Sequence, residues 1–141
     1  MTPEQIDLVE RTLTEVRPAF DDLVEDFYAH LYAADPAVAL MFTDDPARQR
    51  ARFAAELDVI MASIRRHDAF VTEVRELGVR HAGYGVRASH YRTAGPLLLD
   101  ALARALGERW TAEVHEAWLL AYNLTVESMM AGAAGDILDR E

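Results

Sequence analysis

Two histidines stand out in a stretch without acidic residues, LGVRHAGYGVRASHYRTAG, although the whole chain carries a formal net charge of -10. They are His81 and His90. His81 continues an apolar series at the three- and four-residue spacing of one helix face: Phe70, Val74 and Leu77. Its imidazole is therefore predicted to face an apolar interior. Neutral imidazole is a common ligand of iron and zinc, so this position could bind a metal.

The kind of site that His81 could form is narrowed by what the sequence lacks. Zinc requires three or four protein ligands, whereas the chain has no cysteine and no HExxH pair. A single axial histidine in a large apolar pocket is instead typical of haem iron. Two structural alternatives stay open: a histidine favoured by the helix dipole in a last turn, and a hydrogen-bonded core histidine. The other histidines stand singly, without metal-type spacing: His30, His67, His90 and His115.

The elements that position these side chains are predicted to be helices throughout, because Ala, Leu, Glu and Arg dominate and strand-like alternation is absent. Uneven lengths and proline-marked corners indicate an all-α fold, an irregular sandwich of six to seven helices. We expect one domain over residues 1–141, with a loosely held tail from about 132. The predicted elements are a helix opening at Thr2-Pro3, a second one through Val24–Leu31, a short segment over 36–42, a TDDP break with Asp45 as cap, and helices over 47–66, 69–82, 89–106 and from Thr111 onward.

Composition limits the partners. With 141 residues and 51% hydrophobic residues, the chain can build one sizeable core. The negative charge disfavours nucleic acid and anionic membranes, and the absence of cysteine excludes disulfides, iron–sulfur clusters and thiol nucleophiles. There is neither a signal-peptide core nor an apolar run of membrane-spanning length, so we expect a cytoplasmic protein.

The residues around His81 resemble a known family. LGVRH-AGYGV-RASHYRTAGPLLLDAL is similar to the proximal segment of bacterial haemoglobins and of the globin domains of flavohaemoglobins. The shared pattern is an L-G-x-[KR]-H helix end, a G-V turn, an aromatic residue ten positions after the histidine, here Tyr91, and a Leu-rich helix. The resemblance covers nearly the whole chain, from TPEQIDLVERTL to the helix that carries Trp118 and Tyr122. It implies a globin fold around a pocket for b-type haem, with His81 as the proximal iron ligand.

The resemblance also implies residues for the rest of the pocket. PAVALMF matches a short helix that ends in a haem-packing phenylalanine, here Phe42, and DFYAHLY matches a segment with a distal tyrosine, here Tyr28. Counting back from His81 without a gap puts Gln49 at the ligand-facing position, with Phe53 one turn later. Further expected haem contacts are Leu57, Leu77 and Tyr91.

The distal register has an alternative. The join between Phe42 and Gln49 is short, and a slip would put Arg48 or Arg52 at the pocket entrance, near the haem propionates. Judged without the resemblance, Tyr28 is an ordinary core tyrosine. Taken together, however, a tyrosine hydroxyl and a glutamine amide suit dioxygen, which gains partial negative charge at iron, more than carbon monoxide.

One position departs from the pattern. Flavohaemoglobins tie the proximal histidine and the tyrosine at Tyr91 to a glutamate on the last helix, and the matching residue here is Ala133. Peroxidase-like activity is therefore not expected. No GxGxxG and no reductase domain occur in the sequence, so turnover would need an outside reductant.

The sequence thus predicts a globin that reversibly binds dioxygen, and also carbon monoxide and nitric oxide, at a histidine-ligated haem. Two alternatives stay open. One is a nitric oxide dioxygenase working with a separate reductase, and the other is a gas or redox sensor that acts as an interaction module. A monomer and a homodimer are both compatible with the sequence.

Overall fold

The computed structural model describes residues 1–42 and 45–140, with side chains described as far as residue 135. In these residues the chain forms six α-helices and three short 3₁₀ helices, and no strand, which confirms the predicted all-α class. The elements are α1 (Pro3–Val16), η1 (Arg17–Ala19), α2 (Phe20–Ala34), η2 (Pro36–Met41), α3 (Pro46–Ser63), α4 (His67–Gly83), α5 (Ala88–Leu106), η3 (Gly107–Arg109) and α6 (Ala112–Arg140).

The first and last helices begin where the sequence predicts. The Thr2 hydroxyl accepts a hydrogen bond from the backbone amide of Gln5 at 3.1 Å, and the Gln5 side chain accepts one from the Thr2 amide at 2.8 Å. This reciprocal capping box satisfies two amides that would otherwise lack partners. At the start of α6, the Thr111 hydroxyl accepts from the Val114 amide at 3.2 Å.

The middle helices differ slightly from the expected bounds. α3 ends at Ser63 rather than at residue 66, because the next residues form a turn in which the Arg66 amide bonds to the Ser63 carbonyl at 2.8 Å. Asp45 does occupy the N-cap position of α3, but its side chain makes no capping hydrogen bond. Thr43 and Asp44 of the expected TDDP break lie outside the described residues.

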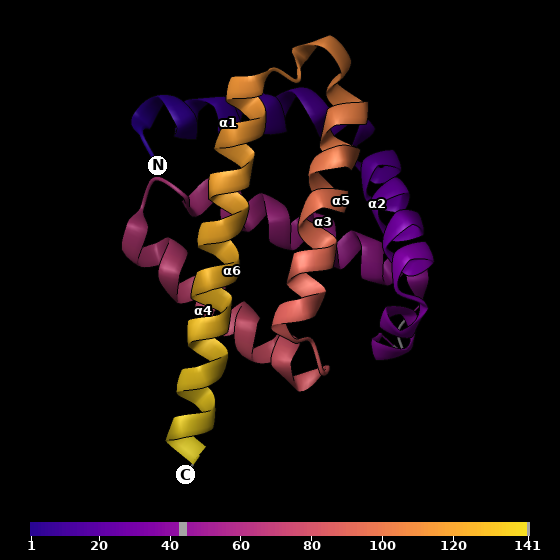
Figure 1. The fold of residues 1–141 in the computed structure, drawn as a ribbon. Helices are drawn as coiled ribbons and strands as arrows, with labels where there is room; N and C mark the ends of the chain where they lie inside the picture. The colour runs from indigo at the N-terminus through magenta and orange to yellow at the C-terminus, as the bar shows by residue number, and fades with distance from the viewer. Residues whose placement is uncertain (43–44, 141) are drawn as a thin grey trace.

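α4 and α6 are the most extensively packed pair of helices. A Cβ added to Gly78 of α4 would lie 2.0 Å from the Met129 carbonyl oxygen of α6, and one added to Gly132 would lie 2.3 Å from the Arg75 carbonyl oxygen. Only glycine permits this approach of two backbones. Figure 1 shows α5 and α6 running side by side, with α1 crossing them near one end. The residues from 132, predicted to be a loose tail, continue α6.

A buried hydrogen bond connects the first and last helices, α1 and α6, within the core. The Trp118 indole Nε1 donates to the Thr12 hydroxyl at 2.9 Å, and this hydroxyl donates to the Leu8 carbonyl at 2.6 Å. Trp118 and Thr12 are both almost fully buried, so the bond satisfies an indole that would otherwise be desolvated without a partner. It fixes the ring of Trp118 against the interior.

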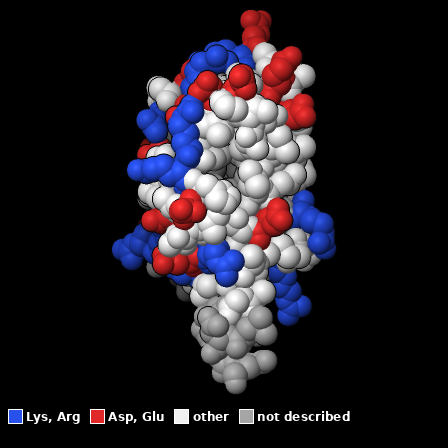
Figure 2. Space-filling view, turned by 90° about the vertical axis from the view of Figure 1, so that its left-hand side faces the viewer, with Lys and Arg blue, Asp and Glu red and all other residues white. Residues whose placement is uncertain are grey.

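Charged side chains lie on the outside. Figure 2 shows one face on which acidic and basic side chains gather around a broad area of other residues. Arg65, in the turn after α3, pairs with Asp7 and Glu10 of α1, and Arg17 pairs with Asp58 at 2.5 Å. Such exposed pairs contribute little to stability individually. Among the described residues, no helix is long and apolar enough to cross a membrane.

Candidate functional site

A cavity of about 150 Å³ is lined by residues of α2, α3, α4, α5 and α6, together with η2 and Phe42. Water occupies roughly 30 Å³ in the liquid, so the space suits a larger apolar group. Its lining is almost entirely apolar and aromatic, as in small-molecule and cofactor sites. Seven of the eight residues predicted for the site line it: Tyr28, Phe42, Phe53, Leu57, Leu77, His81 and Tyr91. The eighth, Gln49, lines an adjoining opening together with Phe42 and His81.

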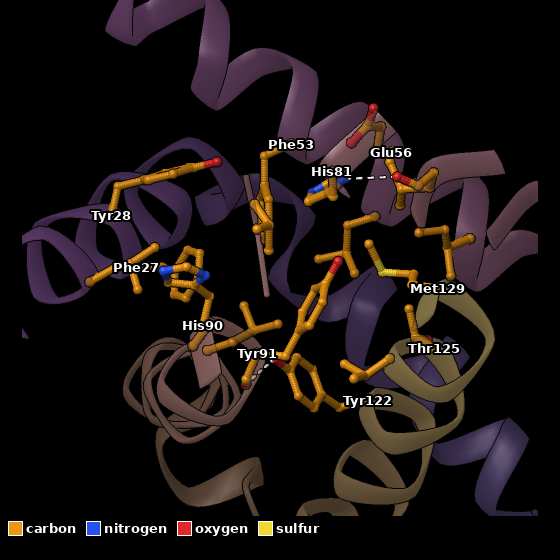
Figure 3. A pocket seen from close by; sticks show the side chains of 18 of the residues that line it. Phe27, Tyr28, Phe53, Glu56, His81, His90, Tyr91, Tyr122, Thr125 and Met129 are labelled. Atoms are coloured by element: carbon orange, nitrogen blue, oxygen red, sulfur yellow. Dashed lines mark hydrogen bonds between the residues drawn. The ribbon is translucent and has the colours of Figure 1, made fainter. Parts of the chain in front are cut away.

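His81 lies in the last turns of α4 and faces this cavity (Figure 3). Its Nδ1 lies 2.9 Å from the Leu77 carbonyl oxygen. A carbonyl only accepts, so Nδ1 carries the proton and Nε2 keeps a lone pair. Burial lowers the pKa of His81, which keeps the imidazole neutral near pH 7. The side chain thus has the charge state and tautomer that a metal ligand needs.

His90 also lines the cavity, but its hydrogen bonding is the reverse of that of His81. Its Nδ1 accepts from the Arg87 backbone amide at 2.8 Å, as part of the cap of α5. The proton of a neutral His90 therefore lies on Nε2. Ligation of a metal by Nε2 would require loss of that proton or of the cap, so the two histidines are not equivalent.

Tyr28 and Gln49 meet at one side of the cavity. The Gln49 amide nitrogen donates to the Tyr28 hydroxyl at 3.3 Å, which joins α3 to α2. Burial raises the pKa of Tyr28 to about 12, so the hydroxyl stays protonated and can donate. Phe53, one turn further along α3, also packs edge-on against Tyr28, with ring centroids 5.6 Å apart. Arg52, which the alternative register would put at the entrance, lines the same opening as Gln49.

Aromatic rings fill much of the remaining wall. Phe53 stacks on Phe27 at a centroid distance of 5.2 Å, and Phe42 lies 5.8 Å from the ring of Tyr84 near the opening. Tyr91 lies 6.4 Å from the His81 ring. The position of Tyr91 is fixed through its backbone, because the Tyr122 hydroxyl donates to the Tyr91 carbonyl at 2.6 Å.

The acidic residue that lines this cavity is Glu56 of α3, whereas flavohaemoglobins were expected to place a glutamate on the last helix. The α6 residues that line it are Trp118, Tyr122, Thr125, Val126 and Met129, none of them acidic. Glu56 lies beside His81 in Figure 3, with its carboxylate 3.7 Å from the Arg80 guanidinium. The sequence analysis missed Glu56, although its spacing from Gln49 and Phe53 puts all three on one face of α3.

The potential metal ligands around the cavity show whether it suits a bare metal ion or a prosthetic group. Among the described residues, no three His, Cys, Asp or Glu side chains gather to hold a metal ion. One neutral imidazole in an apolar cavity therefore suits a metal that brings its own equatorial ligands, and haem is such a group. The residues present fit haem in charge, tautomer and polarity.

This arrangement defines a class of protein: an irregular all-α sandwich that presents a half-buried neutral histidine to an apolar cavity. The family model described as globin matches residues 25–129. The chain belongs to the globin family.

Relatives and solved structures agree with this membership. The chain is 28% identical over 133 residues to a flavohemoprotein of Deinococcus radiodurans, covering 92% of this chain and 33% of that protein. It is 27% identical over 125 residues to one of Bordetella pertussis, covering 86% and 31%. The chain thus spans about a third of the length of these relatives.

Two solved structures share the fold. A bacterial globin from Campylobacter jejuni has a TM-score of 0.84 at 22% identity, covering 98% of this chain and 99% of that one. A hexacoordinated heme protein from an anhydrobiotic tardigrade also has a TM-score of 0.84, at 14% identity, covering 95% and 96%. These likenesses confirm the predicted globin fold.

Proposed function

We propose that this globin binds one b-type haem through Nε2 of His81 and thereby binds dioxygen reversibly, along with other diatomic gases. The observation that carries the proposal is the bond from His81 Nδ1 to the Leu77 carbonyl, which leaves Nε2 open toward the cavity. When bound, haem supplies an iron with a coordination position for a gas. The cavity residues determine how firmly that gas is held.

Tyr28 and Gln49 are the proposed donors on the gas-binding side. The Gln49 amide occupies a lone pair of the Tyr28 oxygen, so the tyrosine proton remains to be donated into the cavity. A gas that acquires partial negative charge is stabilised by such a donor, and more strongly in apolar surroundings than in water. Carbon monoxide acquires less charge and gains less.

The remaining predicted residues would exclude water and orient the group. Phe42 and Phe53 offer ring faces on which a planar macrocycle can pack, and Leu57 and Leu77 extend the apolar wall. Tyr91, whose ring lies 6.4 Å from the His81 ring, would pack on the proximal side of the group, beside its histidine ligand. Exclusion of water preserves the strength of the Tyr28 hydrogen bond.

The experiment is an absorption spectrum of the purified protein in ferric, ferrous and carbon monoxide-bound forms, compared with His81→Ala and His90→Ala. We expect His81→Ala to lose haem or its normal spectrum, and added imidazole to restore a ligated spectrum by occupying the vacated space. His90→Ala is the matched control and should retain the wild-type spectrum. Normal ferrous and carbon monoxide spectra in His81→Ala would reject His81 as the ligand.

Nitric oxide dioxygenation is the second candidate, favoured by the similarity to flavohemoproteins, whose name joins flavin and haem in one protein. In this reaction nitric oxide and dioxygen give nitrate, and a separate reductase returns one electron per turnover. Nitrate formation from nitric oxide, measured with and without an electron donor, distinguishes this candidate from simple gas binding.

A further inference from the structure

Glu56 is a charged side chain that the haem function proposed above does not use. It lies half-buried on α3, and among the described residues that line the cavity it is the one Asp, Glu, Lys or Arg. The rest of the lining is almost entirely apolar and aromatic. A carboxylate at the wall of an apolar cavity is costly, because water solvates its charge poorly there. A role for this charge in the chemistry of the site would explain its position.

The position of Glu56 on α3 puts its carboxylate within reach of a metal bound by His81. Gln49, Phe53 and Glu56 follow one another at spacings of four and three residues, so they share one face of α3, and each lines the cavity or the opening beside it. His81 of α4 lines the same cavity, and Figure 3 shows Glu56 beside it. The carboxylate charge therefore acts on the interior of the cavity as well as on the surface.

Three other charged side chains lie near Glu56 and could cancel its charge. Arg52, Glu73 and Arg80 line the hollow between α3 and α4 together with Glu56, and the Arg80 guanidinium lies 3.7 Å from the Glu56 carboxylate. The formal charges of these four side chains sum to zero. Of the four, however, only Glu56 also lines the cavity, and its side chain is 29% exposed, against 52% for Arg80. The negative member of the ion pair thus lies toward the cavity and the positive member toward solvent.

Two ionisable groups that line the cavity respond to this asymmetry. Burial is the largest influence on the pKa of His81 and lowers it; among the neighbouring charges, Glu56, which raises this pKa, outweighs Arg80, which lowers it. Burial is also the main reason why the pKa of Tyr28 is raised to about 12, and here Glu56 outweighs Arg52. At both groups the carboxylate therefore has more influence than the arginine.

We propose that Glu56 tunes the redox equilibrium of the bound haem by stabilising its ferric form. The proposal rests on the haem function proposed above. Reduction of the iron takes one electron from an external reductant and removes one positive charge from the site, while the chain makes and breaks no bond. An anionic side chain near the metal favours the more positive state. Glu56 thus makes ferric haem the resting form and requires a strongly reducing electron donor, and Arg80 offsets part of this effect.

The reduction potential of the haem-loaded protein, measured by spectroelectrochemistry, tests the proposal. Glu56→Gln removes the negative charge, and Arg80→Gln removes its positive partner. Both variants break the ion pair, but they change the charge in opposite directions. Asp58→Asn is the matched control, because it removes one negative charge from the same helix at a residue that pairs with Arg17 and is not among those lining the cavity.

We expect Glu56→Gln to shift the equilibrium toward ferrous haem about tenfold, which raises the potential by about 59 mV for one electron. Two unit charges about 10 Å apart, at an effective dielectric constant of about 20, interact by about this much. Arg80→Gln should lower the potential and have a smaller effect, about threefold, because solvent screens its more exposed charge better. Glu56→Asp, which keeps the charge, and Asp58→Asn should each differ from the wild type by less than about twofold.

Substituted porphyrins give a second readout that involves no redox reaction. Gallium(III) protoporphyrin carries one more positive charge on its metal than zinc(II) protoporphyrin does. Each is loaded into the protein, and its release to an excess of apomyoglobin is followed by absorbance. We expect Glu56→Gln to release the gallium form about tenfold faster relative to the zinc form, and Asp58→Asn to leave this ratio unchanged.

Three results would overturn the role of Glu56. Potential shifts of the same sign in Glu56→Gln and Arg80→Gln would mean that the pair acts by holding α3 against α4 and not through its charges. A shift below about twofold in Glu56→Gln, or an equal shift in Asp58→Asn, would show that the charge of Glu56 does not act on the iron. A wild-type protein without a haem spectrum refutes the proposed function itself, whereas a normal spectrum with unchanged potentials refutes only this inference.

Discussion

The amide nitrogen of Gln49 donates a hydrogen bond to the hydroxyl of Tyr28 over 3.3 Å, and this bond connects α3 to α2 at the edge of the cavity. Because Gln49 acts as the donor, the tyrosine oxygen serves as acceptor and its own proton stays available. Burial raises the pKa of Tyr28 to about 12, so the proton is retained throughout the neutral range. The pair therefore forms a short donor chain directed at the cavity.

Replacing Tyr28 with Phe should accelerate dioxygen release while changing carbon monoxide release little. The variant keeps the ring contacts with Phe27 and Phe53 and removes only the hydroxyl. A hydrogen bond to a charged group contributes roughly 1.5–3 kcal/mol, which corresponds to about tenfold or more in the release rate. Stopped-flow measurement of both gases tests this, with Tyr32→Phe as the control. Equal effects on the two gases would make Tyr28 a packing residue only.

Replacing Gln49 with Leu should have a smaller effect in the same direction. The variant leaves the Tyr28 hydroxyl in place but removes the donor that orients it. We expect dioxygen release to rise about threefold, and the double variant with Tyr28→Phe to be no faster than Tyr28→Phe alone, because both changes affect one chain. Additive effects of the two changes would show that Gln49 reaches the gas independently.

Stability should decline in alkali because of the buried tyrosines. Below pH 10 both the folded and the unfolded chain keep Tyr28 protonated, so its contribution is fully present. Above pH 10 the unfolded chain releases this proton, whereas burial holds the folded pKa at about 12, so stability is lost as the pH rises from 10 to 12. At pH 11 the loss from Tyr28 is about 1.4 kcal/mol.

Urea unfolding at pH 8 and pH 11 measures this loss. The variant Tyr28→Phe should lose less stability between these two pH values than the wild type does. Tyr91, whose pKa is also raised to about 12 by burial, adds a further loss that remains in the variant. An identical pH dependence in both proteins would contradict the assigned burial of the Tyr28 hydroxyl.

Replacing Thr12 with Val should destabilise the fold although the two side chains have nearly the same shape. The indole of Trp118 would lose its acceptor while remaining 2% exposed, and a buried donor left without a partner costs about 1–3 kcal/mol. Urea unfolding is the measurement, and Thr12→Ser, which keeps the hydroxyl, is the control. A smaller loss in Thr12→Val than in Thr12→Ser would refute the role of this bond.

Much of the fold is readable from local patterns. The stripe that ends in His81 repeats at helix spacing, and α4 buries its apolar members Phe70, Val74 and Leu77. Thr2 and Thr111 cap the helices that follow them. These features depend on residues close in sequence. The position of Gln49 beside Tyr28 could also be predicted, because an ungapped helix transmits the register from one end to the other.

Features that depend on distant residues were not predicted. The close approach of Gly78 to Met129 and the bond from Trp118 to Thr12 join segments far apart in the chain, and neither partner indicates the other. Glu56 was missed because acidic residues on helices are usually solvated.

The last prediction concerns the second axial position in the absence of gas. His81 Nε2 is the one cavity imidazole nitrogen that the hydrogen bonds leave with a lone pair, because His90 is fixed in the opposite tautomer by the Arg87 amide. Gln49 is a weak iron ligand, and Phe53 offers no donor atom. We therefore expect a five-coordinate, high-spin ferrous haem, in contrast to the hexacoordinated tardigrade protein of the same fold.

A ferrous absorption spectrum near neutral pH tests this expectation, and a broad visible band is the expected result. Sharp, split visible bands would indicate a six-coordinate, low-spin haem and contradict it. His90→Ala then identifies the source: loss of the split bands in that variant would mean that His90 abandons the α5 cap to bind iron. With the site five-coordinate, gas binding should proceed in a single phase whose rate rises linearly with gas concentration, because no internal ligand has to leave first.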